Sequence, residues 1–203
     1  MAITQNLTEL NAVNSVLQAI GQSPVTELDY ENPETSFVYN LIQECSRDIQ
    51  DEGWVFNREH AYPLTPDSNG EIKIPANVLR MDVSWNDIYR FTDVVKREGK
   101  LYDKMHHSYV FKGPIYMDIV WLFDLTDLPS VFQRYITHTA AKRAAVQMVD
   151  NPQLAQMLQQ QEQQSRASCI EYETQQGDYN MLDLQPGTAY RTYRPYTALR
   201  RGT

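Results

Sequence analysis

Apolar residues near the start of the chain recur every three or four positions, which is the spacing of one face of an α-helix. The first apolar face comprises Leu10, Val13, Leu17 and Ile20. Thr8 is a candidate N-cap for this helix, and Gly21 followed by Pro24 predicts its end. A second apolar face comprises Phe37, Leu41, Ile42, Cys45 and Ile49. It follows Pro33, which suits a first helical turn, and it stops before Gly53, so the pattern predicts two helices within residues 1–53.

The same spacing returns near the end of the chain and predicts two longer helices between residues 129 and 177. Asp127 as an N-cap and Pro129 in the first turn predict the start of the first, and Asn151-Pro152 predicts its junction with the second. The apolar face of the first comprises Phe132, Tyr135, Ile136, Thr139, Ala140 and Ala144. The second has only a thin apolar stripe, formed by Leu154, Met157, Leu158, Cys169 and Tyr172. Its middle, residues 159–164, holds glutamines and one glutamate and cannot bury much surface alone.

Between these helical parts the chain contains short β-branched and aromatic runs separated by turn residues. The runs are residues 54–56, 61–64, 71–74, 81–84, 91–96, 101–102, 109–111 and 116–123. Turns are expected at 66–70, 97–100 and 113–114, and Asn69-Gly70 is the strongest hairpin signal. The predicted fold class is therefore α+β. Long antiparallel helices from residues 1–53 and 125–182 form an α-helical bundle domain, an antiparallel β domain of residues 54–124 is inserted into it, and residues 183–203 form an extended C-terminal arm.

Composition places the chain among ordinary globular proteins, with 42% hydrophobic and 22% charged residues in a length of 203. No apolar run approaches the roughly 20 residues of a membrane span, and the first residues lack the basic and apolar regions of an export signal. We therefore expect no membrane association. Cys45 and Cys169 are far apart in predicted helices and are expected to be reduced core residues.

The formal net charge of −8 lies entirely in the first third of the chain, because residues 1–64 hold ten acidic and two basic residues. The exposed face of the second predicted helix contributes Glu44, Asp48, Asp51 and Glu52. This face is either an ordinary solvated surface or a surface that repels a negatively charged partner.

The end of the chain is basic, because residues 184–203 hold four arginines and no acid. Tyrosines alternate with these arginines, and prolines and glycines argue against a helix, so an extended arm is predicted. Its candidate docking residues are Tyr190, Arg191, Tyr193, Arg194, Tyr196, Arg200 and Arg201. Tyrosine and arginine are enriched at protein–protein interfaces, so we interpret the segment as a protein-docking arm. A non-specific DNA contact and an inert tail are the alternatives.

Residues with catalytic chemistry do not form a recognisable site. A pair of Cys45 or Cys169 with His60 or His138 has no neighbour that would activate the thiol. His106-His107 would point to opposite faces of a strand, so a surface loop explains them better than a metal site. The spacing of Asp124 and Asp127 suits helix capping rather than acid–base catalysis. We predict no catalytic residue, no metal ligand and no cofactor.

Three segments together resemble a known family. They are ELNAVNSVLQAIGQSPVTEL (residues 9–28), DEGWVFN (residues 51–57) and CIEYETQQGDYNML (residues 169–182), and LPSVFQRYIT (residues 128–137) also fits. In this order and spacing they resemble the tail tubular protein A family of short-tailed bacteriophages. The resemblance implies a structural virion protein of the head–tail connector type, located in the short tail of the virion and, during assembly, in the host cytoplasm.

The resemblance also implies partners. Copies would form a homo-oligomeric, dodecameric ring between the portal protein and the nozzle, which is tail tubular protein B, and tail fibres would attach to it. The ring would line the channel for viral genome ejection, through which double-stranded DNA passes without specific binding. Within this interpretation Gln159, Gln160, Gln163 and Gln164 form a subunit interface, the four acidic residues face the channel, and the C-terminal arm docks on the portal. A nucleic-acid-binding accessory protein and a small hydrolase are the alternatives.

Overall fold

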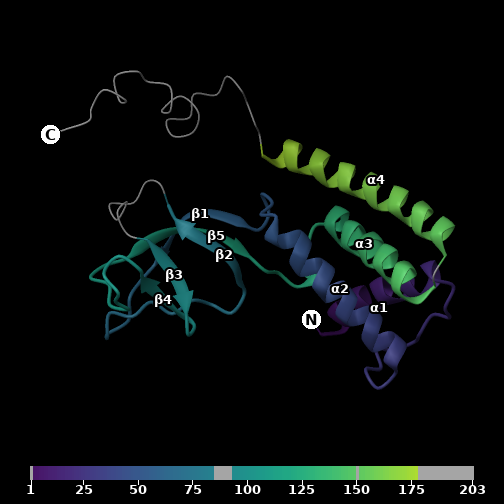
Figure 1. Cartoon of the computed structure of the whole chain (residues 1–203), viewed down its shortest axis with the longest axis horizontal. Helices are drawn as coiled ribbons and strands as arrows, with labels where there is room; N and C mark the ends of the chain where they lie inside the picture. Colours follow the sequence, from purple (N-terminus) through teal and green to yellow (C-terminus); the bar gives the residue numbers. More distant parts are fainter. Residues whose placement is uncertain (1, 85–92, 150, 178–203) are drawn as a thin grey trace.

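The computed structural model describes residues 2–84, 93–149 and 151–177, with side chains described from Thr8 onward. Four α-helices and two small antiparallel sheets occur in the order α1, α2, β1–β5, a 3₁₀ helix η1, α3 and α4. The fold class is therefore α+β, as predicted. Helices gather at one end of the molecule and strands at the other, with the strands contributed by the middle of the chain (Figure 1). The predicted C-terminal arm lies outside the described residues.

The first two helices lie mainly where the sequence predicts them. Helix α1 spans Ala2–Ala19, so the prediction that Thr8 caps its start is wrong. Its end is as expected: Gly21 has φ +80°, the amide of Gln22 donates to the carbonyl of Leu17 and that of Gly21 to the carbonyl of Gln18. These two bonds are the Schellman arrangement that a glycine at this position allows. Helix α2 spans Pro33–Asp51 and begins with Asn32, whose side chain accepts the amide hydrogen of Glu34.

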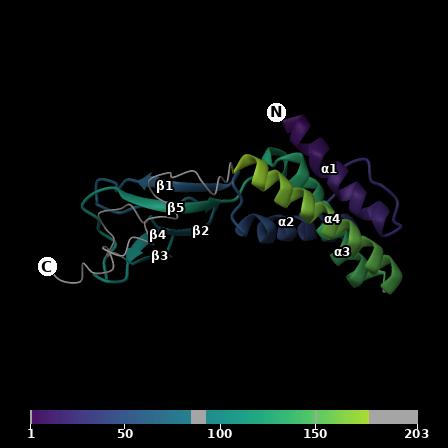
Figure 2. The ribbon, with the colours of Figure 1, turned by 90° about the horizontal axis from the view of Figure 1, so that it is seen from above.

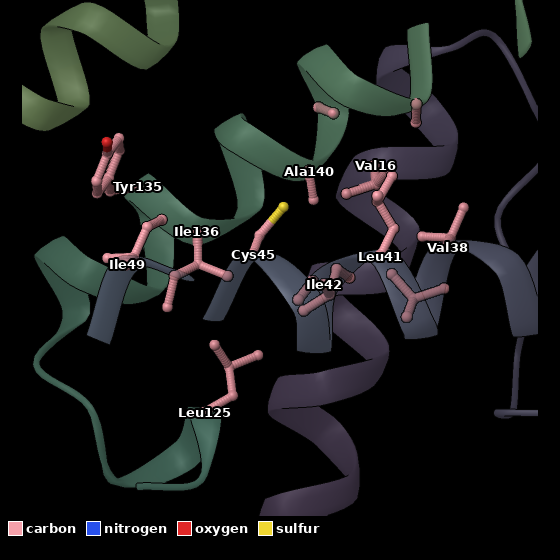
Figure 3. Packing of buried hydrophobic residues seen from close by; sticks show 14 of the residues in the cluster. Val16, Val38, Leu41, Ile42, Cys45, Ile49, Leu125, Tyr135, Ile136 and Ala140 are labelled. Atoms are coloured by element: carbon pink, nitrogen blue, oxygen red, sulfur yellow. The ribbon is translucent and has the colours of Figure 1, made fainter. Parts of the chain in front are cut away.

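Helix α3, which spans Ser130–Met148, is the centre of the helical half. It packs against α1, α2 and α4, and α1 and α2 lie on the side of α3 away from α4 (Figures 1 and 2). All six residues of its predicted apolar face are buried, and Ala141 and Ala145 are buried as well. The alanines allow neighbouring helices to approach α3 on more than one face. Figure 3 shows Ala140 and Ile136 of α3 among Val16, Ile42 and Cys45 of the two N-terminal helices.

The start of α3 differs from the prediction. Residues Leu125–Asp127 form η1, in which the backbone amide of Asp127 donates to the carbonyl of Asp124. Asp127 therefore lies before the N-cap position of α3 and does not cap it. Pro129 occupies the N-cap position of α3 without a side-chain hydrogen bond. The acid therefore belongs to the preceding turn.

Helix α4 spans Pro152–Gln176 and folds back along α3. The predicted junction is confirmed: the side chain of Asn151 accepts the amide hydrogens of Gln153 and Leu154, and Pro152 occupies the first turn. Burial on α4 is limited to Leu158, Ser165 and Cys169, with Leu154 and Tyr172 partly buried. Met157 is 62% exposed, so its assignment to the apolar stripe is wrong.

The strands form two antiparallel sheets. β1 (Arg58–Leu64), β5 (Ile115–Trp121) and β2 (Val78–Val83) form one sheet in the order β1-β5-β2, and β3 (Val94–Arg97) pairs with β4 (Lys100–Asp103). The turn between β3 and β4 is as predicted, with positive φ at both Glu98 and Gly99. A second core fills this half and comprises Leu64, Ile72, Ile74, Val78, Leu101, Phe111, Ile115, Met117, Ile119 and Trp121.

Two β predictions are wrong. Asn69-Gly70 does form a turn, in which the amide of Gly70 donates to Asp67, but the segments on either side do not pair as a hairpin. β1 pairs instead with β5, and Glu71 makes only an isolated bridge to Val110. Residues 54–56, expected in a strand, form a turn at the junction of the two halves.

Candidate assembly surfaces

The two halves are joined by two buried side-chain amides, Asn57 in the segment DEGWVFN and Gln50 directly before it. Asn57, which is 1% exposed, donates to the carbonyls of Gln50 and Trp121, both at 2.8 Å, and accepts the amide hydrogen of Trp54 at 2.8 Å. Gln50, which is fully buried, exchanges hydrogen bonds with the backbone of Phe123 at 2.9 and 3.0 Å. Because these bonds connect α2 to the chain after β5, they fix the sheet to the helices.

Gly53 makes this junction possible. Its φ of +80° lies in the left-handed region, and a Cβ atom there would lie 3.1 Å from the guanidinium of Arg80 and 3.2 Å from the side chain of Val120. The Arg80 guanidinium also donates to the carbonyl of Glu52. A side chain at residue 53 would therefore be strained and crowded.

The end of α4 contacts the same junction. The carboxylate of Glu173 accepts the amide hydrogen of Val55 at 2.9 Å, and Tyr172 packs edge-on against Phe132. Phe132 in turn contacts the rings of Trp54 and Phe56. Two segments that are separated by more than a hundred residues thus meet around the Phe132 ring.

The acidic face consists of Glu44, Asp48 and Asp51 of α2 and of Glu52 at its C-cap. All four residues are exposed, and three of them bind arginines on other helices. Arg143 of α3 contacts Glu44 at 3.2 Å and Asp48 at 2.8 Å, and Arg166 of α4 makes a paired contact with Glu52 at 2.8 and 2.9 Å. Asp51 is the member of this set for which the described residues contain no ion pair. The acidic face therefore also ties α2 to α3 and α4, and its free negative charge is smaller than the sequence suggests.

Polar contacts also line the interface between α3 and α4. Lys142 contacts Glu162 at 2.5 Å, and the imidazole of His138 contacts the hydroxyl of Ser165 at 2.6 Å. Arg166 donates to the hydroxyl of Tyr135, and burial raises the pKa of that hydroxyl above its ordinary value. These contacts explain how α4 stays on α3 with only three buried residues.

The predicted interface glutamines, Gln159, Gln160, Gln163 and Gln164, are all exposed. Their side chains form no hydrogen bond with any other described residue. Whether they contact another subunit stays a prediction. The predicted docking residues Tyr190, Arg191, Tyr193, Arg194, Tyr196, Arg200 and Arg201 lie outside the described residues.

The cysteines and histidines that were considered above for catalysis or metal binding have the following environments. Cys45 and Cys169 are fully buried free thiols, and burial raises the pKa of each to about 11. His106 contacts the carboxylate of Asp103 in a loop, at 2.6 Å, whereas His107 contacts Tyr102. Among residues 2–84, 93–149 and 151–177, no three His, Cys, Asp or Glu side chains gather as metal ligands. No helix in the same ranges is long and apolar enough to cross a membrane.

Comparison with known proteins agrees with the resemblance. A family model described as tail tubular protein matches residues 10–179. Tail tubular protein A of Klebsiella phage KP34 is 32% identical over 126 residues, which is 61% of this chain. The match covers 63% of the length of that relative.

A match over residues 10–179 defines a structural protein of the bacteriophage tail. The chain belongs to the tail tubular protein family, and its place is in the tail of the virion.

Several residues that organise these surfaces were not singled out from the sequence. Arg143 and Arg166 lie 95 to 114 positions from the acids they bind, so local spacing gives no sign of the pairing. Gln50 and Asn57 are polar residues at a helix end and in a turn. The only signal for Asn57 was its place in the family segment DEGWVFN.

Proposed function

We propose that the chain is an adaptor subunit that forms a homo-oligomeric, dodecameric ring between the portal protein and the tail nozzle. The observation that carries this proposal is its membership of the tail tubular protein family across residues 10–179. The relative in phage KP34 bears the name tail tubular protein A, the type of adaptor that the sequence resembles. The ring would assemble in the host cytoplasm and then remain in the virion.

Exposed glutamines support the oligomer. Gln159, Gln160, Gln163 and Gln164 present amides to solvent on a helix whose other side is held by α3. Amide groups exchange hydrogen bonds with a neighbouring copy without the desolvation cost of burying charges. This property suits a repeated contact in a closed ring.

The α-helical bundle would form the wall of the ring, and the β half would face the nozzle, tail tubular protein B, and the tail fibres. In this arrangement the acidic face of α2 lines the ejection channel, where like charges keep the passing double-stranded DNA from binding. Since Glu44, Asp48 and Glu52 also hold Arg143 and Arg166, Asp51 is the residue that tests this role without breaking an ion pair. Asp51→Lys should slow genome ejection while particles assemble normally, and unchanged ejection would remove the channel role.

In this proposal the C-terminal arm docks on the portal protein. Residues 184–203 carry four arginines and no acid, which suits docking into an acidic surface. Purified portal rings should bind the full-length chain and fail to bind a chain that ends at residue 183. Circular dichroism of the shortened chain checks that its helices persist. Full binding by the shortened chain would exclude the arm as the docking element.

The ring itself is tested by electron microscopy of the recombinant chain, alone and with purified portal rings. The proposal expects ring-shaped particles, either free or on the portal. A chain that stays monomeric in both conditions at high concentration would contradict it.

A further inference from the structure

The outward side of α4 has no charged side chain over most of its length. We call the outer α4 face the set Gln153, Gln156, Gln160, Gln163, Gln164 and Ala167, all of which are exposed. Their spacing of three and four places them on one side of the helix, opposite Leu158, Ser165 and Cys169. The glutamine side chains of this face form no hydrogen bond within the described part of the chain. Their hydrogen-bonding capacity is thus available to a partner.

Helix α4 has one charged residue on its outward side, Glu171, near the C-terminal end of the helix. It carries four charged residues: Glu162, Arg166, Glu171 and Glu173. Glu162 binds Lys142, Arg166 binds Glu52, and Glu173 accepts the amide hydrogen of Val55. Glu171 is exposed, and its carboxylate contacts only Gln175 of the same helix, at 3.5 Å. Glu171 is therefore the charged residue of α4 whose side chain contacts no other described element.

A second surface of the helical half also presents exposed polar side chains that carry no charge. Asn11, Ser15 and Gln18 are exposed at helical spacing on α1 and carry no charge. Beside them lies a shallow groove of about 320 Å³ between α1 and the start of α3. Its lining includes Asn11, Ser15, Ser130, Gln133, Arg134 and Thr137. Arg134, which is exposed and makes no ion pair with a described residue, is the one charge among the residues that line it.

Two different surfaces are what a closed ring requires. In a cyclic ring each copy uses one surface toward the preceding copy and another toward the next. Every copy carries a net charge of −8, so neighbours repel unless they meet where acidic side chains are absent. The exposed face of α2 holds Glu44, Asp48, Asp51 and Glu52 and is unsuited to contact with a second acidic copy. The outer α4 face and the α1–α3 groove are two different surfaces, and neither has an acidic side chain among the residues named for it above.

We propose that the outer α4 face of one copy docks into the α1–α3 groove of the next copy. This inference rests on the proposed ring and identifies the two surfaces that close it. The amides of Gln160 and Gln164 then exchange hydrogen bonds with Asn11, Ser15 and Gln133 across the contact.

The single charges on the two surfaces have opposite signs. Glu171 of the outer side of α4 and Arg134 of the groove lie at the same end of the α3–α4 pair, because Cys169 contacts the carbonyl of Val131. In a closed ring, neighbouring copies are related by a rotation about the ring axis without translation along it. Residues that contact each other across the interface therefore lie at about the same position along that axis. With α3 and α4 running along the ring axis, Glu171 reaches Arg134 of the next copy and forms an ion pair.

Site-directed cross-linking in assembled phage particles tests the contact. Particles are prepared with chains that carry Gln160→Cys, Ser15→Cys or both, and are treated with a bismaleimide cross-linker. Cys45 and Cys169 are buried and do not compete for it. The double variant should give a ladder of cross-linked multimers on a denaturing gel, and each single variant should give monomers. Asn40→Cys combined with Gln160→Cys is the matched control, since Asn40 is an exposed residue of α2.

Charge exchange provides an independent test. Arg134→Glu and Glu171→Arg should each lower the yield of infectious particles by roughly tenfold, and the double exchange should restore it. Cross-linking of Gln160→Cys alone would show that α4 meets α4 and would overturn the inference, as would two independent losses without rescue. Particles with a visible ring but no α1–α4 cross-link overturn the inference alone. Particles that contain the protein without a ring overturn the proposed function as well.

Discussion

Replacing Asn57 by alanine tests how the helical half is joined to the β half. The substitution removes three hydrogen bonds. The Asn57 side chain donates two of them, to the carbonyls of Gln50 and Trp121, and accepts the third from the backbone amide of Trp54. Each contributes about 1 kcal/mol net. The carbonyl of Gln50 keeps a second donor, the amide of Gly53, whereas the Trp54 amide is left unpaired. We therefore expect Asn57→Ala to lower the free energy of unfolding by about 3 kcal/mol.

Urea denaturation followed by circular dichroism and by tryptophan fluorescence measures this loss, because Trp54 and Trp121 both lie at the junction. The melting temperature should fall by roughly 10 °C for a protein of this size. Asn40→Ala is the matched control, since Asn40 is exposed on α2, and it should change stability by less than about 0.5 kcal/mol. A loss for Asn57→Ala no larger than that of the control would refute the assignment of the junction to this amide.

Four further predictions follow from buried and charged groups. Phe132→Ala should cost about 3–5 kcal/mol in urea denaturation, because Phe132 is fully buried against three aromatic rings; a loss below 1.5 kcal/mol would contradict this packing. The thiols of Cys45 and Cys169 have pKa values raised from 9.0 to about 11, so the folded protein should resist thiol reagents at pH 8 and react at both cysteines in denaturant. The same shifts favour the folded state fully below pH 9 and lose that contribution as the pH rises toward 11, so stability should fall across this interval. Glu52→Lys should destabilise the protein by up to about 1 kcal/mol because it breaks the exposed pair with Arg166, whereas Asp51→Lys should leave unfolding unchanged; equal effects would contradict the difference in pairing.

The helices were predictable because their signals are local. Burial of Phe132, Ile136 and Ala140 follows from spacing within a single helix, and the cap at Asn151 follows from the proline after it. Sheet pairing was not predictable in this way. β1 pairs with β5 across some fifty intervening residues, and the turn at Asn69-Gly70 fixes only the backbone of its own residues. A turn signal predicts where the chain reverses its direction, but it does not predict which strands pair.

Polar pairings were missed for a related reason. The contact of Arg166 with Glu52 spans 114 positions, so an exposed acid on a helix looks the same in the sequence whether it is solvated or paired. The amide of Asn57 satisfies three backbone groups that become neighbours only after β5 returns to the helices. Family resemblance marked that segment without stating what it does.

The connection between the two halves has a mechanical consequence. The chain crosses between them twice, once after Gly53 and once before Asp124, and the crossings are bound to each other through Gln50 and Asn57. A force that pulls the sheet from the helices is therefore shared by two covalent crossings, which the hydrogen bonds of Gln50 and Asn57 hold to each other. Bonds loaded in parallel share the force, whereas bonds that open one after another each bear all of it. The junction should therefore transmit tension between the halves as a stiff coupling.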